Sequence, residues 1–166
     1  MNKHCSTTDS CGHHHSCVVL VPIFNHLDKN QMEEIKHAVK PLSFKKGEFI
    51  YKAGDASDSL YIVNKGRVRI YRLSESGKEQ LVRFLNPGDF TGELALFNRG
   101  LHESFAEAIL DTEICVIRQK ELQDLLTKFP SISLKILEEF SRRLEQSERQ
   151  ATRIATETAE TRLALF

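Results

Sequence analysis

The chain has 166 residues, of which 40% are hydrophobic and 28% are charged, and its 23 basic side chains balance 23 acidic ones. This length predicts one domain of ordinary size with a small appendage. Proteins that bind phosphate backbones usually carry a basic excess or stripe, so the balance argues against a whole-chain polyanion binder. No apolar run approaches the roughly 20 residues that cross a bilayer. The first residues lack the pattern of a signal peptide, so we expect a soluble, cytoplasmic protein.

The four cysteines are unevenly placed. Cys5, Cys11 and Cys17 lie in the first seventeen residues, whereas Cys115 stands alone. The first seventeen residues are otherwise almost entirely polar, so they cannot bury enough apolar surface to offset the cost of becoming ordered. We therefore expect either that another interaction fixes this segment or that it stays flexible.

The first predicted element is a short helix over residues 28–39. Met32, Ile35, Ala38 and Val39 recur at helical spacing, and Pro41 follows the pattern.

The period then changes to that of short strands separated by glycines. The apolar runs are Phe44, Phe49–Tyr51, Leu60–Ile62, Val68–Ile70, Leu81–Leu85 and Ala106–Ile117. The glycines between them are Gly47, Gly54, Gly66, Gly77 and Gly88, most of them about 11 residues apart. Turn glycines at this interval predict a small all-β roll or barrel.

Helical spacing returns in the last third of the chain, with a short helix over Glu121–Phe129 and a long one from Pro130 past Thr158. Heptad spacing marks two lines of the long helix, three residues apart. They are Leu137, Leu144, Ala151 and Thr158, and Phe140, Ser147, Ile154 and Thr161. Four of these eight are Ser, Thr or Ala, so the pattern favours a parallel dimer helix of marginal strength. Packing of the helix against its own roll is the alternative.

Three motifs connect this plan to a known family. They are Phe44-x-x-Gly47 with Gly54, Ser59-Leu60-Tyr61-Ile62-Val63-x-x-Gly66, and Pro87-Gly88-Asp89-Phe90-x-Gly92-Glu93-Leu94-Ala95-Leu96-Phe97. From about Phe24 to Phe166, the chain resembles the sensory half of the Crp/Fnr family of bacterial transcription regulators. The resemblance implies a mainly β plus α fold: a cyclic-nucleotide-binding-type β-roll (a double-stranded jelly roll) with a short N-terminal helix and a long C-terminal dimerisation helix.

The resemblance also divides the chain. It implies a cysteine-rich cluster-binding segment over residues 1–23, a β-roll sensor over 24–130, a dimerisation helix over 131–158 and the start of a winged helix-turn-helix domain over 159–166. The recognition helix of that domain is absent from the sequence. We therefore expect a truncated protein that cannot bind DNA by itself.

One departure from the family pattern concerns the ligand of the roll. Cyclic-nucleotide sensors of this family bind the cyclic phosphate with an Arg-Ser pair after the Gly-Glu-Leu cassette. Here the corresponding pair is Glu103-Ser104. A carboxylate repels a phosphate, whereas an arginine binds it through charge-assisted hydrogen bonds. We therefore predict no cyclic-nucleotide site and interpret Gly92-Glu93-Leu94 as a structural turn.

The cysteines resemble those of the Fnr branch, which holds an oxygen-labile 4Fe-4S cluster on three N-terminal cysteines and one in a late strand. The resemblance assigns Cys5, Cys11, Cys17 and Cys115 as the ligands, and four thiolates complete the corners of a cubane. Both N-terminal gaps are five residues, whereas the common Fnr pattern has a gap of two. This departure changes the local wrapping of the chain.

Three other interpretations of the cysteines stay open. Cys115 is an ordinary core residue in the first. In the second, zinc binds cysteines together with His4, His13, His14 or His15, although structural zinc sites usually space paired ligands more closely. In the third, Cys115 and an N-terminal cysteine form a reversible disulfide that acts as a redox switch. Under none of these interpretations would the chain be an enzyme, and the sequence contains no recognisable catalytic arrangement.

The resemblance implies an oxygen-responsive transcription activator. An intact cluster would favour the homodimer, and oxygen would shift the population away from it because the seam is weak. DNA would be the partner of the missing domain, and the loop Ser74–Glu79 could contact RNA polymerase.

Overall fold

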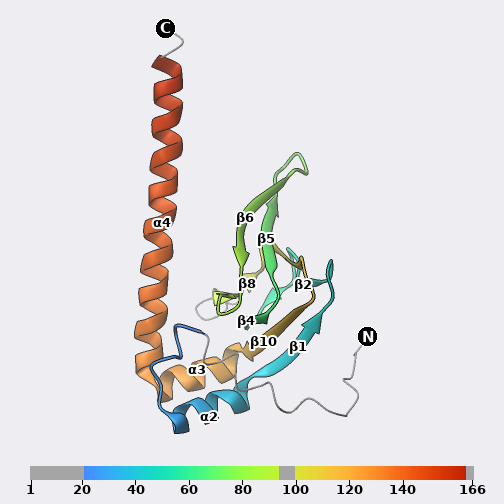
Figure 1. Cartoon of the computed structure of the whole chain (residues 1–166), viewed down its shortest axis with the longest axis vertical. Coiled ribbons are helices and arrows are strands. Elements are labelled where there is room, and N and C mark those ends of the chain that lie inside the picture. The colour runs from blue at the N-terminus through green and yellow to red at the C-terminus, as the bar shows by residue number, and fades with distance from the viewer. Residues whose placement is uncertain (1–20, 94–99, 164–166) are drawn as a thin grey trace. The chain divides into compact units, whose positions relative to one another are not determined.

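The computed structural model describes the backbone of residues 21–93 and 100–163, and the side chains of these ranges up to residue 153. The chain forms two compact units, residues 1–128 and residues 129–166. Among the described residues, the first unit contains the β-roll and the short helices α2 (Lys29–Ala38) and α3 (Gln119–Lys128), and the second consists mainly of the long helix α4 (Pro130–Leu163) (Figure 1).

Helix α2 (Lys29–Ala38) occupies the predicted position. It begins with a capping box: the carboxylate of Asp28 accepts a hydrogen bond from the Gln31 amide at 2.9 Å, and the Gln31 side chain accepts one from the Asp28 amide at 3.0 Å. Two amide groups that the first turn leaves unpaired are thereby satisfied. The helix buries Ile35, and one residue, Val39, separates its end from strand β1.

Antiparallel strands form the roll. They are β1 (Lys40–Phe44), β2 (Phe49–Tyr51), β3 (Ala56–Ser57), β4 (Ser59–Lys65), β5 (Val68–Leu73), β6 (Glu79–Leu85), β7 (Phe90–Thr91), β8 (Gly100–Leu101), β9 (Phe105–Ala108) and β10 (Thr112–Arg118). One four-stranded sheet has the order β1-β10-β4-β7, the other has the order β2-β9-β5-β6, and β3 pairs with β8. This arrangement confirms the predicted β-roll.

The predicted strand run Ala106–Ile117 is two strands, because the chain changes sheet within it. β9 belongs to one four-stranded sheet and β10 to the other. Between them, the hydroxyl of Thr112 donates to the Leu110 carbonyl at 2.8 Å and accepts from the Arg67 amide at 3.2 Å. Leu110 lies exposed in this turn. Because it is apolar, the sequence pattern groups it with the strand residues on either side.

An apolar cluster lies in the interior of the roll. Its buried members come from both four-stranded sheets and are Tyr51, Val63, Val68, Ile70, Leu85, Ala106 and Ile114. Val68 and Ile70 of β5 both belong to it, two positions apart, because side chains along a strand alternate between its faces. The cluster holds the two sheets together and fixes the register of each strand.

The five glycines predicted to lie in turns all adopt positive φ, and Gly92 does so as well. Gly66 illustrates a second requirement besides backbone conformation. Its φ is 90°, and a Cβ there would lie 2.5 Å from the carbonyl oxygen of Asp111. The turn between β4 and β5 can therefore pack against the start of β10 only with glycine at this position.

Two helices follow the roll in sequence. Helix α3 (Gln119–Lys128) buries Leu122 and Leu125. Helix α4 (Pro130–Leu163) begins with proline, which has no amide hydrogen to leave unpaired in a first turn. α4 continues without a break past Thr158, where the resemblance placed the end of the dimerisation helix. Within the part of the chain that the structure describes, no helix is long and apolar enough to cross a membrane.

We predict that Gly66→Ala lowers the free energy of unfolding by about 2 to 4 kcal/mol, because it adds a backbone clash to the cost of positive φ. Gly77→Ala is the matched control: φ is 76° there and nothing lies within 4 Å of the added Cβ. It should cost only about 1 kcal/mol. Urea unfolding of the two variants measures both effects, and equal losses would contradict the packing role of Gly66.

Candidate functional site

Cys115 lies near the middle of β10, and its face is now defined. Ile114 and Val116 pack in or against the interior cluster of the roll, so alternation directs Cys115 to the outer face of the sheet. In register, Cys115 lies between Pro41 of β1 and Ile62 of β4. It is only 3% exposed, which places its sulfur away from bulk water.

The sulfur of Cys115 takes part in a disulfide bond. The other three cysteines of the chain, Cys5, Cys11 and Cys17, lie outside the described residues. Among the described residues, no three His, Cys, Asp or Glu side chains are grouped to hold a metal ion. The structure therefore describes one of the four predicted cluster ligands.

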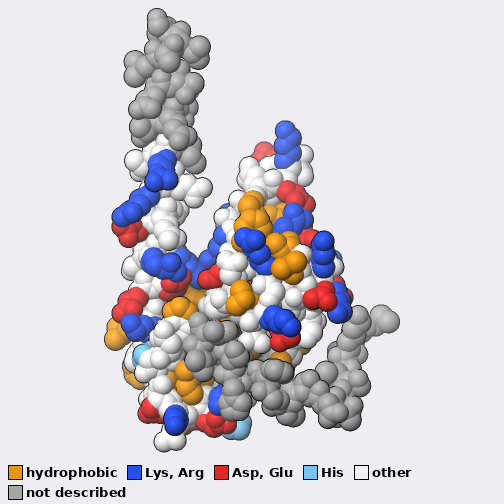
Figure 2. Space-filling view, in the orientation of Figure 1, with side chains coloured by type: hydrophobic (Ala, Val, Ile, Leu, Met, Phe, Trp, Pro, Cys, Tyr) orange, Lys and Arg blue, Asp and Glu red, His pale blue; other side chains and the backbone are white. Residues whose placement is uncertain are grey.

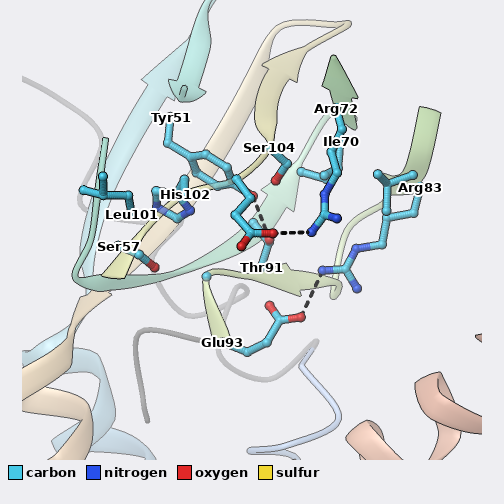
Figure 3. Close-up of a pocket in the computed structure, with 13 residues that line it drawn as sticks. Tyr51, Ser57, Ile70, Arg72, Arg83, Thr91, Glu93, Leu101, His102 and Ser104 are labelled. Atoms are coloured by element: carbon cyan, nitrogen blue, oxygen red, sulfur yellow. Dashed lines mark hydrogen bonds and ion pairs between the residues drawn. The ribbon is translucent and has the colours of Figure 1, made fainter. Parts of the chain in front are cut away.

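The roll also contains a cavity of about 250 Å³, and Cys115 is not among the residues that line it. Figure 3 shows Tyr51, Ser57, Leu101 and His102 along one side of it and Ile70, Arg72 and Arg83 along the other. Thr91 and Glu93 lie below, and Ser104 lies between the two sides. The side chains come from strands of both four-stranded sheets, from the β3–β8 pair and from the segments beside β7 and β9.

Two ion pairs balance the charges in this cavity. Arg72 donates to Glu103 at 2.9 Å, and Arg83 donates to Glu93 at 3.2 Å. The Arg72–Glu103 pair is exposed, with 54% and 74% of the two side chains accessible, whereas the Arg83–Glu93 pair is 29% and 18% accessible. Each guanidinium in the cavity thus already has a carboxylate partner.

Two backbone irregularities place the second pair. Ile70 pairs with Arg83 and Tyr71 with Leu81, so Val82 is an extra residue in β6. Such a bulge redirects side chains, and both Val82 and Arg83 line the cavity. Gly92 has a φ of 84°, and a Cβ there would overlap the Ser59 carbonyl. Gly92 therefore packs against β4, and the next residue, Glu93, forms its ion pair with Arg83.

An aromatic pair forms another part of the wall. The rings of Tyr51 and His102 are stacked, with centroids 3.7 Å apart and planes 8° from parallel, and the Tyr51 hydroxyl lies 2.9 Å from that of Thr91. Burial raises the pKa of Tyr51 and lowers the pKa of His102, which keeps both side chains neutral at pH 7. The Nε2 atom of His102 is enclosed and has no hydrogen-bond partner among the described residues.

The predicted dimer seam lies on α4. Leu137 and Leu144 are 55% and 61% exposed, Ser147 and Ala151 are exposed, and Phe140 is half-buried. The side chains of Ile154 and Thr158 lie outside the described residues. Ion pairs within the helix flank the seam: Lys135–Glu138, Glu139–Arg142, Glu139–Arg143 and Glu145–Arg149. Figure 2 shows charged side chains of both signs along this helix.

Glu139 anchors the ion pairs beside the seam. Partial burial opposes its ionisation, but hydrogen bonds from Arg142 and Arg143 outweigh this effect and lower its pKa. The carboxylate is therefore charged at neutral pH and holds both arginines along the helix.

Sequence reasoning located some of these residues and missed others. Glu103 and Ser104 lie in the cavity, at the position that the Arg-Ser comparison indicated. Glu93, interpreted from the sequence as part of a structural turn, also lines the cavity. The sequence did not predict four further lining residues: Tyr51, Arg72, Arg83 and His102. Only His102 had a signal that could have found it, because it directly precedes the Glu103-Ser104 pair.

Comparison with known proteins places the chain in a family. The model of the cyclic nucleotide-binding domain matches residues 41–129. A probable transcriptional regulator, flp, of Lacticaseibacillus casei is 32% identical over 92% of this chain and 69% of its own length. The anaerobic regulatory protein of Pasteurella multocida is 33% identical, and the fumarate and nitrate reduction regulatory protein of Vibrio cholerae is 32% identical. Each of these two matches covers 86% of this chain.

The chain belongs to the Crp/Fnr family, on its Fnr branch. Members of this family are dimeric, DNA-binding regulators without enzymatic activity, which confirms the prediction that the chain is not an enzyme. The chain spans 51% of the P. multocida relative and 56% of the V. cholerae relative.

Solved structures confirm the Crp/Fnr fold. The catabolite activator protein of Thermus thermophilus superposes with a TM-score of 0.74 at 25% identity, over 81% of this chain and 63% of that one. The predicted cyclic-nucleotide-binding-type roll with a long C-terminal helix is therefore confirmed.

The cavity yields a prediction about charge. Glu103→Arg should raise the affinity of the chain for cyclic AMP about tenfold or more, because it replaces a repulsive carboxylate by a charge-assisted donor beside Ser104. Isothermal titration calorimetry measures the change. Glu75→Arg adds the same charge in the exposed turn between β5 and β6 and should have no effect. An equal gain in both variants would show that general charge, and not the cavity, controls binding.

Proposed function

We propose that this chain is the sensor and dimerisation part of an Fnr-type transcription regulator that responds to oxygen. Cys5, Cys11, Cys17 and Cys115 would hold a 4Fe-4S cluster that controls dimerisation and, through it, DNA binding. The observation that carries the proposal is the position of Cys115, buried on the outer face of β10 in a chain whose relatives include anaerobic regulatory proteins.

The donor set fits the cluster. Thiolates are the ligands that iron–sulfur clusters use, and four of them occupy every iron of a cubane without remainder. When bound, the cluster would supply a group that oxygen destroys or converts to a 2Fe-2S form. Cys115 would contribute a fixed ligand, because its backbone is held between β1 and β4. Burial of this sulfur limits access of water to the ligand.

The N-terminal cysteines would gain order from the same bonds. Their segment has too few apolar side chains to fold by burial alone. Ligand bonds can provide the missing free energy, as they do where metal binding and folding are coupled. The segment would thereby be tied to β10, the strand that carries Cys115.

The seam of α4 would convert the gain or loss of the cluster into a change of oligomeric state. Leu137 and Leu144 are exposed, which suits contact with a second copy, but the seam also contains Ser147 and Ala151. A seam of low intrinsic affinity can be shifted by a few kcal/mol, whereas a strong one would stay dimeric. The remaining part of the whole protein would contact DNA, and Ser74–Glu79 would be available to RNA polymerase.

The domain organisation is part of the proposal. Residues 1–23 would bind the cluster, residues 24–130 would form the sensor, residues 131–158 would form the dimerisation helix, and residues 159–166 would begin the DNA-binding domain. The cytoplasm would be the compartment, since both DNA and reduced thiols are found there.

One observation favours a second candidate. Because Cys115 takes part in a disulfide, a metal-free thiol switch is an alternative function for the same cysteines. The two states exclude each other at this sulfur, since a cluster needs the thiolate and a disulfide consumes it. Reduction of Cys115 is thus the first requirement of the cluster-binding form.

Anaerobic reconstitution tests the cluster. The reduced chain should bind one 4Fe-4S cluster, with iron and sulfide in equal amounts and a brown absorption that air bleaches. Cys115→Ser should lose the cluster, because serine removes one of four thiolate ligands. Retention of the full iron and sulfide content by Cys115→Ser would exclude Cys115 as a ligand.

Thermal unfolding of the metal-free forms is the control for this loss. With both proteins fully reduced, so that the disulfide of Cys115 does not contribute, Cys115→Ser and the parent should unfold within a few degrees of each other, and lost iron then reports a lost ligand. An iron-free parent with a mapped disulfide would select the thiol switch, and stoichiometric zinc would select a zinc-binding domain.

The seam yields a separate prediction. Leu144→Glu should weaken the anaerobic dimer by at least about tenfold, because it places a charge on both sides of an apolar contact. Gln146→Glu adds the same charge at an exposed position outside the two heptad lines and should leave the dimer intact. Sedimentation velocity over a concentration series measures both dissociation constants. Equal behaviour of the two variants would place the dimer contact elsewhere.

A further inference from the structure

We propose that His102 anchors β8 to the roll at neutral pH and releases it when the imidazole is protonated. The anchor uses none of the cysteines, so this inference goes beyond the proposed oxygen response and gives the roll an acid response of its own. Three observations carry it: the ring is enclosed, its Nε2 atom has no hydrogen-bond partner among the described residues, and the strand pairing of β8 is short.

The His102 ring lies in an aromatic environment. Only 8% of the residue is exposed, and the ring stacks on that of Tyr51, as Figure 3 shows, with 3.7 Å between the centroids. The ring of Tyr61 lies 6.2 Å away in a tilted orientation. Burial raises the pKa of both tyrosines, so neither carries a charge at neutral pH. The contacts of the ring therefore suit an uncharged imidazole.

The pairing of β8 with β3 is short. It consists of two residue pairs, Ala56–Leu101 and Ser57–Gly100. Leu101 is 66% exposed and Gly100 is exposed too, so neither fixes the strand by burial. A two-stranded sheet is marginally stable at best in water without further packing. Other contacts must therefore hold β8 against the roll.

His102 supplies such contacts from the position that follows β8. Its amide donates to the Asp55 carbonyl at 2.9 Å, and its carbonyl accepts from the Gly54 amide at 2.8 Å. Its side chain is buried, whereas the next residue, Glu103, is exposed. The stacked ring thus fixes the end of β8 and the turn before β3 at the same time.

Protonation would put a positive charge into this enclosed position. An imidazolium donates from both ring nitrogens, and the proton on Nε2 would have no acceptor among the described residues. A buried donor without an acceptor loses its hydration without compensation, and the cost is greater for a charged group. The ring would recover this hydration by leaving the enclosure.

Ionisable groups around the ring decide the direction of the effect. They are Tyr51 of β2, Asp55 and Asp58 on either side of β3, Tyr61 of β4 and Glu93 after β7. The three carboxylates attract a charged imidazole, but none of them has a hydrogen bond to the ring among the described residues. Arg72 and Arg83 line the same cavity, and each is paired with a carboxylate. Burial outweighs the carboxylates, and the pKa of His102 is lowered.

The lowered pKa sets the sign of the pH dependence. An exposed histidine titrates at about pH 6.5. Because the folded pKa is lower, the enclosed ring stabilises the attached state of β8 fully above this pH and progressively less as the pH falls through it. Glu103, which accepts a hydrogen bond from Arg72 at 2.9 Å, would move with the released strand. Acid would thereby loosen one wall of the cavity.

Amide hydrogen exchange of the reduced, metal-free chain at about pH 7.5 and about pH 5.5 tests the anchor. After correction for intrinsic exchange rates, the protection factors of the Gly54 and His102 amides should fall at least about threefold at the lower pH. The Val63 amide, which donates to the Asp89 carbonyl at 2.9 Å, is the internal control and should keep its protection. Unchanged protection of Gly54 and His102, or an equal loss at Val63, would overturn the proposal.

His102→Phe removes the titrating group but retains a ring that can stack on Tyr51. The Gly54 amide of this variant should have the same protection at both pH values. His37→Phe makes the same change at an exposed position in the last turn of α2 and should keep the pH dependence of the parent. A pH-dependent loss in His102→Phe as large as in the parent would assign the effect to another group and contradict the anchor.

A nuclear magnetic resonance titration of the parent needs no variant. The His102 ring should titrate with a midpoint below about 6.5, and the Gly54 amide should lose protection over the same pH range. A midpoint at or above about 6.5 would exclude the proposed release. Since none of these measurements involves iron, sulfide or a disulfide, failure here would leave the proposed oxygen response untouched.

Discussion

Burial of β10 on both faces is the constraint on which the rest of the structure depends. Its inner face contributes Ile114 to the interior of the roll, and its outer face carries Cys115, which is equally enclosed. Pairing with β1 and β4 on either side fixes its register. A slip of one residue would move Cys115 into the interior and Ile114 out of it. The hydrophobic pattern that directs Ile114 into the roll therefore also places the sulfur of Cys115 on the outer face of β10.

The cavity shows how one changed residue alters the chemistry of a shared fold. With a carboxylate at position 103, Arg72 gains an intramolecular ion-pair partner at the mouth of the cavity, and the charges of the two pairs cancel. The bulge at Val82 and the close approach of Gly92 bring Arg83 and Glu93 together below it. The framework of this Crp/Fnr protein thus remains that of a cyclic nucleotide-binding domain, while its cavity no longer offers an unpaired cation to a phosphate.

Helix α4 combines two properties that suit regulated association. Its own ion pairs, such as those of Glu139, run along the helix and need no partner molecule. Its apolar seam residues Leu137 and Leu144 remain exposed, and the later seam residues Ser147 and Ala151 add little apolar area. When such a helix self-associates only weakly, a small change in free energy shifts its equilibrium between monomer and dimer. Such a change is what the proposed cluster would provide.

The sequence alone determined the roll, the turns at its glycines and the existence of the helices, because period and backbone conformation are local properties. It also singled out position 103, since a carboxylate replaces an expected arginine there. Only the tertiary structure decided that Ala106–Ile117 is two strands, because a change of sheet has no apolar signature. Only it paired Arg72 with Glu103 and Arg83 with Glu93, which lie 31 and 10 residues apart in the sequence. Side chains so separated meet only when both sheets have closed around the interior, and no local pattern encodes that encounter.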